Sequence, residues 1–205
     1  MTPGSIRADR GQTLPIYIWL TAILLFAALA FFAFAQAASA RNGAQSAADA
    51  AALAAAQAAR DDLLEELVEA IGSGEDGEWL DWLDGAEFPA GDGGPEAAAD
   101  ALAAENDSEA TGFSRDQVGG YLGYWVQVTT NYTVGDSIIP GTESQHAKAE
   151  ATAVIKPRCD VDPSDDPAAS VAFSCDGESI EIDPDDFDLD DLPDAADLFS
   201  VHLAK

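Results

Sequence analysis

The residues best suited to chemistry in this chain are two cysteines and two histidines. Cys159 and Cys175 are the only cysteines, and fifteen residues lie between them. A zinc site needs cysteine or histidine ligands at close spacing, whereas His146 and His202 stand alone in the sequence. We therefore expect no metal at these residues, and the two cysteines form either a disulfide or a pair of unlinked thiols.

Carboxylates are far more numerous, and two runs of them contain the oxygen ligands that calcium prefers. The runs are CDVDPSDDP, at residues 159–167, and IDPDDFDLDDLPDAAD, at residues 182–197. Neither has the Asp-x-Asp-x-Asp-Gly spacing with a closing glutamate. Blocks of like charge usually stay in solvent, so we expect a solvated acidic surface, with weak calcium binding as the alternative.

The sequence lacks the motifs of common enzymes. It has no Gly-x-Ser-x-Gly elbow, no phosphate-binding loop and no His-Glu-x-x-His string, and two histidines leave few candidates for a general base. Carboxylate pairs that could act on sugars would arise by chance among so many acids. We expect neither an enzyme nor a cofactor.

Charge divides the chain into two parts. Residues 1–60 carry four arginines and two aspartates, a balance of +2, whereas residues 61–205 carry 36 acids and five bases, a balance of −31; together they give the net charge of −29. The acidic part would be repelled by phosphate, and no basic stripe offsets that repulsion. Nucleic-acid binding is therefore excluded.

The element that must position the acidic part is an apolar run at residues 16–35, in which Thr21 is the one polar residue. As a helix, these twenty residues would span about 30 Å, the thickness of the hydrocarbon core of a bilayer. Tyr17 and Trp19 lie at one end, where aromatic rings favour the headgroup zone. We predict a transmembrane helix at residues 14–40, in contact with membrane lipid.

Arg7 and Arg10 precede the span, which places residues 1–13 in the cytoplasm and the acidic part outside the cell. The alternative is a secretory signal cut after Ala40, but such signals have apolar regions of up to about 15 residues. Because exported compartments permit disulfides, we predict a bridge between Cys159 and Cys175 that contributes about 3 kcal/mol to stability.

Helix-forming residues continue beyond the span without a break. Alanine has the lowest helical cost of any residue, so one helix should run over residues 14–71, on the order of 85 Å long, and end at Gly72. Either its small side chains pack on the protein's own domain, or they admit neighbouring helices in an assembly; the sequence leaves both open. The helix-packing candidates are Ala47, Ala48, Ala51, Ala52 and Ala55.

The rest of the chain favours an α+β fold, with short helices followed by an antiparallel sheet. Leu63, Leu67 and Ile71 recur at helical spacing and need a partner surface, and the aromatic residues of segment 79–88 should supply packing area rather than a ligand cage. Strand patterns cover 124–134, 146–155, 170–174, 179–182 and 199–203. The expected divisions are a cytoplasmic segment (1–13), a transmembrane helix (14–40), an alanine-rich helix (41–71), an acidic linker with short helices (72–112) and a β-rich exported domain (113–205).

The segment Arg10-Gly11-Gln12, the apolar run and the string ARNGAQSAADAAALAAA together resemble the N-terminal region of the Tad (tight adherence) pilus-assembly proteins of the TadE/TadG-like family, particularly actinobacterial members. The resemblance implies a single-pass envelope protein whose partners are other pilus-assembly proteins or copies of itself. Pilin-like precursors of this wider group are cut after a glycine, which makes Gly11 a candidate processing position. They then carry a glutamate at the fifth residue, where this chain has Ile16, so an uncleaved anchor fits better.

Two functions follow from these observations. The first is a membrane-anchored structural or assembly component of a Flp-type (Tad) pilus or a related secretion system, on the bacterial cell surface. The alternative is a single-span extracellular acidic module that binds cell-wall material or cations.

Overall fold

A computed structural model of the 205-residue chain describes residues 13–73, 78–85, 88, 93–135, 144–162, 170–187 and 192–204. The elements in chain order are α1 (Thr13–Ser73), α2 (Glu78–Asp84), α3 (Gly94–Glu105), β1 (Ser108–Val118), β2 (Tyr121–Thr133), β3 (His146–Pro157), β4 (Cys159–Asp160), β5 (Val171–Cys175), β6 (Glu178–Ile182), η1 (Pro184–Asp186), α4 (Ala195–Leu198) and β7 (Phe199–Leu203). Helices and antiparallel sheets in one chain confirm the predicted α+β class.

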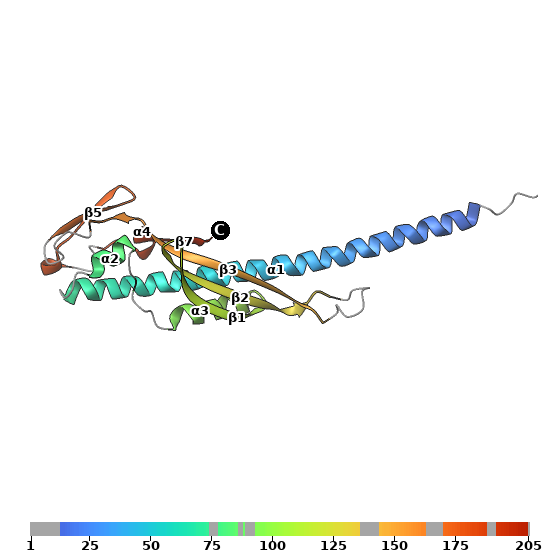
Figure 1. Cartoon of the computed structure of the whole chain (residues 1–205), viewed down its shortest axis with the longest axis horizontal. Helices are drawn as coiled ribbons and strands as arrows, with labels where there is room; N and C mark the ends of the chain where they lie inside the picture. Colours follow the sequence, from blue (N-terminus) through green and yellow to red (C-terminus); the bar gives the residue numbers. More distant parts are fainter. Residues whose placement is uncertain are drawn as a thin grey trace, which may run out of the picture.

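The longest element is α1, a single helix of 61 residues that is about 90 Å long at 1.5 Å per residue. Residues 13–39 project from the body of the protein, and residues 40–73 run through it (Figure 1). We call these the free half and the embedded half of α1. Neither Asn42 nor Gly43 interrupts the helix, because the alanines around them are strong helix formers. The predicted helix over residues 14–71 is confirmed.

A four-stranded antiparallel sheet, in the order β1-β2-β3-β7, supports the embedded half. Gly119 and Gly120 join β1 to β2 with φ angles of +63° and +87°, the combination that a tight hairpin turn requires. The opposite end of β2 leads into the β2–β3 hairpin, which runs alongside α1 toward the free half (Figure 1). β7 pairs only with the last part of β3, residues 153–157.

The core lies between α1, α3 and the sheet. α1 contacts α3, β2 and β3, and Ala99 and Ala103 are the buried alanines that α3 turns inward. Toward the end of α1, Leu63, Leu67 and Ile71 are buried in the same core. The surface against which these three side chains pack therefore belongs to the same chain.

The far end of the domain is built from α2 and a small sheet in the order β4-β5-β6. Trp79 and Leu83 of α2 are buried, and Trp82 and Phe88 pack against the core. Phe88 meets Phe199 edge-on, with ring centroids 6.2 Å apart. The predicted packing role of this aromatic segment is confirmed.

The sequence did not predict β1. This strand begins at Ser108 and pairs with β2 along its length, so the expected division between residues 112 and 113 falls inside it. The sheet and the preceding short helices α2 and α3 form one packed unit with α1.

Candidate functional site

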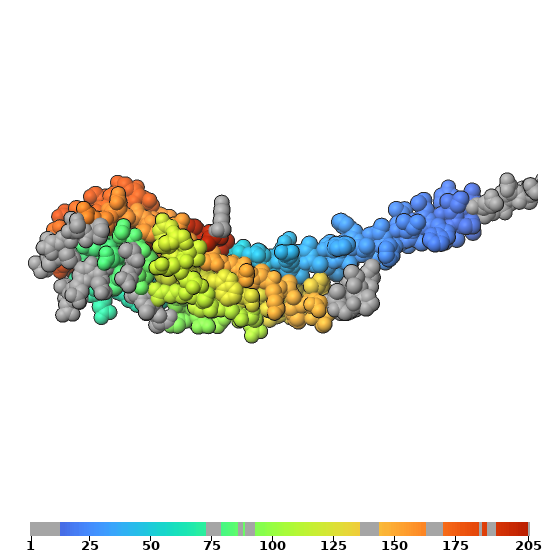
Figure 2. All heavy atoms as spheres, viewed as in Figure 1, coloured from blue at the N-terminus to red at the C-terminus, as the bar shows by residue number. Residues whose placement is uncertain are grey.

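The free half of α1 is the most unusual surface of the protein, because its large apolar side chains are exposed. Phe31, for example, is 76% exposed, and Figure 2 shows this half as a bare rod leaving the body. The hydroxyl of Thr21 donates to the carbonyl oxygen of Tyr17 at 2.8 Å, so the one polar side chain of the run is satisfied within the helix. Within the described residues, α1 is the one helix long and apolar enough to cross a membrane.

The five predicted helix-packing alanines all lie in the embedded half. Ala47, Ala48, Ala51, Ala52 and Ala55 are completely buried, and the elements that α1 contacts there are α3 and the sheet of the same chain. Small side chains let these elements approach the helix axis closely. Of the two interpretations left open by the sequence, the structure shows packing on the protein's own domain.

The predicted disulfide is present between Cys159 and Cys175. The two residues are directly opposite each other on β4 and β5. Beside the bridge, Arg158 forms an ion pair with Asp176 at 3.1 Å. The disulfide therefore ties the small sheet together at the end of the domain that lies furthest from the free half (Figure 1).

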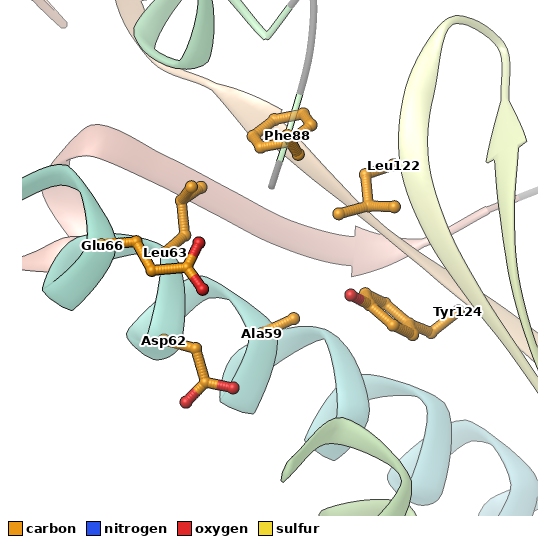
Figure 3. Close-up of a pocket in the computed structure, with 7 residues that line it drawn as sticks. All are labelled: Ala59, Asp62, Leu63, Glu66, Phe88, Leu122 and Tyr124. Carbon is orange, nitrogen blue, oxygen red and sulfur yellow. The ribbon is translucent and has the colours of Figure 1, made fainter. Parts of the chain in front are cut away.

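A small cavity lies between the embedded half and the sheet (Figure 3). Its volume of about 20 Å³ is enough for one water molecule but not for a substrate. The ring of Tyr124 points from β2 toward the turns of α1 that carry Asp62 and Glu66. Burial raises the pKa of Tyr124 above its ordinary value of 10.0; Arg115 opposes the rise, and Asp62 and Glu66 add to it. The hydroxyl is therefore held in its neutral, proton-bearing form.

Residues that could hold a metal are not brought together in the part of the chain that the structure describes: no group of three histidine, cysteine, aspartate or glutamate residues lies close enough. The two acidic runs are only partly described, because residues 163–169 and 188–191 lie outside it. His202 lines an open depression of about 420 Å³ on the sheet. In the same depression, Nζ of Lys156 lies 4.6 Å from the centroid of the Tyr121 ring.

The candidate processing position Gly11 lies outside the described residues. Ala40, the cut site of the alternative, is a buried residue within α1, at the start of the embedded half. A cut there would divide the helix at the point where it enters the domain.

The sequence analysis missed the place where the β2–β3 hairpin reaches the free half. Gly135 lies against Gln36, since a Cβ added to Gly135 would be 3.5 Å from the side-chain nitrogen Nε2 of Gln36. The Tyr132 hydroxyl rests on Gly43, where an added Cβ would overlap it. No local pattern predicts either contact, because the residues that each contact joins are far apart in the sequence.

These features define an α+β protein in which one helix is both an exposed apolar segment and the core of the domain. Residues 11–58 match the family model described as putative Flp pilus-assembly TadE/G-like, or Tad. The match covers the free half and the alanine-rich part of the embedded half, and it confirms the resemblance to the TadE/TadG-like family. The chain has no match among curated proteins or solved structures. The match to the Tad family model and the exposed apolar helix fit a membrane-anchored pilus-assembly component.

Proposed function

We propose that this protein is a single-span structural component of a Flp-type (Tad) pilus or a related secretion system, and that it acts without catalysing a reaction. The observation that carries the proposal is the continuity of α1: the apolar free half and the core of the domain are one helix. The match to the Tad family model, over residues 11–58, includes the point where the free half meets the embedded half.

The proposed orientation places the N-terminus in the cytoplasm and the domain outside the cell. Arg7 and Arg10 precede the span, and positive charge favours the cytoplasmic side. The disulfide between Cys159 and Cys175 suits an oxidising, exported compartment. The large negative charge of the exported part keeps it soluble outside the membrane.

A continuous helix gives such a component a fixed geometry. A flexible linker would set only the distance between membrane and domain, whereas a helix also sets the direction in which the domain points. The free half offers its apolar surface to lipid or to the apolar helices of other pilus proteins or of further copies of itself. The buried alanines supply the domain core and are not part of that outer surface.

The test is to interrupt α1 at the junction and measure pilus assembly. Residues 36–39 would be replaced by Gly-Ser-Gly-Ser in full-length protein, with Ala-Ala-Ala-Ala at the same positions as the matched control. We expect both variants to insert into the membrane, and only the alanine variant to restore pili in cells that lack the gene.

Deletion of the gene is the reference for this test. Normal pili in its absence would contradict the proposal and favour an extracellular binding module. Protease added to wall-stripped cells should remove the acidic domain and leave a membrane fragment; full protection of the domain would reverse the proposed orientation.

A further inference from the structure

The four-stranded sheet has two faces, and α1 packs on one of them. Along β2, Tyr124, Val126 and Val128 are buried in the core on that side, and the residues that alternate with them point to the opposite face, which we call the outer face. The outer face carries the open depression of about 420 Å³, which is lined by the β1–β2 turn and by residues of β2, β3 and β7. This volume is in the range of sites that hold a small ligand.

Apolar side chains form the floor of the depression. The side chains of Val118 and Val154 both reach the space above Gly123, since a Cβ added to this glycine would be 3.2 Å from the first and 3.3 Å from the second. Val154 is only 3% exposed, and Leu203 adds to the apolar lining. Because residue 123 has no side chain, the two valines meet over it and leave a hollow above them.

Two nitrogen-bearing side chains, Lys156 and His202, line the same depression. They come from adjacent strands: Val154 of β3 lies opposite His202 of β7, and Lys156 is two residues further along β3, on the same face. Nζ of Lys156 lies 4.6 Å from the centroid of the Tyr121 ring. The ring attracts the ammonium group and limits the positions that it can take, so the cation is partly ordered before a ligand arrives.

The positive charge of Lys156 stands out in an acidic domain. Residues 61–205 carry 36 acids and five bases. Even so, the part of the chain that the structure describes places no carboxylate in an ion pair with Lys156; there its ammonium group lies over the Tyr121 ring. By contrast, Arg158 is paired with Asp176. Lys156 can therefore pair with an acid of another molecule.

The balance of charge and apolar surface selects the class of ligand. One ammonium group neutralises one negative charge, and a neutral imidazole adds a hydrogen bond without adding charge. The net charge of −31 on residues 61–205 repels a dianion such as phosphate more strongly than a monoanion. The apolar floor favours a ligand that carries apolar groups next to its charge. A carboxylate between apolar side chains meets all three conditions.

We propose that the depression binds a glutamate or aspartate side chain of a partner protein. The carboxylate lies beside Lys156 and His202, and the apolar neighbours of the bound acid contact Val118 and Val154. Because the depression is open, one side chain can enter it while the rest of the partner stays outside. This site goes beyond the structural role proposed above and does not depend on the membrane anchor, so either proposal can fail while the other stands.

The experiment measures binding of two synthetic peptides to the full chain in detergent micelles. Acetyl-Val-Glu-Val-amide carries the carboxylate, and acetyl-Val-Gln-Val-amide is the matched control without it. Methyl NMR spectra of valine-labelled protein report contact at Val118 and Val154, and the core methyls of Val126 and Val128 report the integrity of the fold. We expect saturable shifts at the first pair alone, with an affinity for the acidic peptide about fivefold above that of the control. Equal affinities would overturn the proposal.

Two lysine variants test whether the site or the overall charge attracts the acidic peptide. Lys156→Gln should abolish the preference for the acidic peptide. Lys148→Gln is the matched control, since Lys148 is an exposed residue of the same strand and the same face but does not line the depression; it should retain the preference. Equal losses in the two variants would contradict the proposed site.

A phosphorylated peptide separates a carboxylate site from a general anion site. Acetyl-Val-phosphoserine-Val-amide carries a charge of about −2 at neutral pH, so we expect it to bind more weakly than the glutamate peptide. Tighter binding of the phosphopeptide would overturn the assignment of a carboxylate ligand.

Discussion

The free half of α1 carries large apolar side chains that are exposed, whereas the embedded half is buried through alanines as far as Ala59 and through larger side chains only near its end, at Leu63, Leu67 and Ile71. Both halves belong to one unbroken helix. A lipid-facing helix needs apolar area in all directions, but a helix at the centre of a small domain needs other elements to approach its axis. As far as Ala59, the size of the apolar residues, more than their hydrophobicity, therefore distinguishes the buried part of this helix from its exposed part.

The largest expected effect comes from removing volume in the embedded half. Leu67→Ala should lower the free energy of unfolding of the domain by about 2–5 kcal/mol, because the side chain is fully buried and its loss leaves a cavity. The matched change Leu25→Ala, in the free half, should leave that free energy unchanged. Denaturant unfolding of the full chain in detergent, followed by tryptophan fluorescence, measures both; equal effects would remove the distinction between the halves.

Loss of the disulfide should affect only the domain. Replacing both Cys159 and Cys175 by serine should lower its stability by about 3 kcal/mol, since the bridge closes a loop of about fifteen residues. Membrane insertion of the free half, measured by resistance to alkaline extraction, should not change. In oxidised wild-type protein the two cysteines should resist alkylation, because a disulfide has no free thiol. Rapid labelling of both cysteines would count against the bridge.

A larger side chain should also have different effects on stability in the two halves of α1. Ala51→Leu places a larger side chain at a completely buried position and should cost about 1–3 kcal/mol by overpacking. Ala28→Leu, at an exposed position of the free half, should be neutral and should insert normally. If Ala51→Leu leaves the thermal unfolding of the domain unchanged, the close approach of α3 and the sheet to α1 is wrong.

The smallest expected effect is a change with pH. Because the raised pKa of Tyr124 means that the folded state favours the protonated form, its contribution is complete below the unfolded pKa of about 10 and is lost as the pH rises from there through the folded pKa. Tyr124→Phe should therefore lose less stability above pH 10 than the wild type.

Phe113→Leu is the control for this measurement. It alters a ring whose centroid lies 5.9 Å from that of Tyr124 without removing a titrating group. Its stability should fall with pH in parallel with the wild type, and a parallel fall in Tyr124→Phe would contradict the assignment.

Local sequence was sufficient for α1 and for most strands, because alanine-rich composition and alternating patterns act over a few residues. It failed at β1, SEATGFSRDQV, which has few large apolar residues and is held in place by its register with β2. The contacts of Tyr132 with Gly43, and of Gly135 with Gln36, join positions that are 89 and 99 residues apart. No short-range pattern encodes them, and the same holds for Tyr124 facing Asp62 and Glu66.

The unbroken course of α1 also gives the protein a mechanical property. From Gln36 to Ile71 the helix is about 50 Å long. With residues 16–35 in the membrane as proposed, this part of α1 would act as a lever arm whose fulcrum lies at the membrane surface. A change of about 10° in the tilt of the span, within the range that such helices adopt, would swing the disulfide-bonded tip sideways by about 9 Å. Forces applied to that tip would in turn be transmitted to the lipid bilayer with the same leverage.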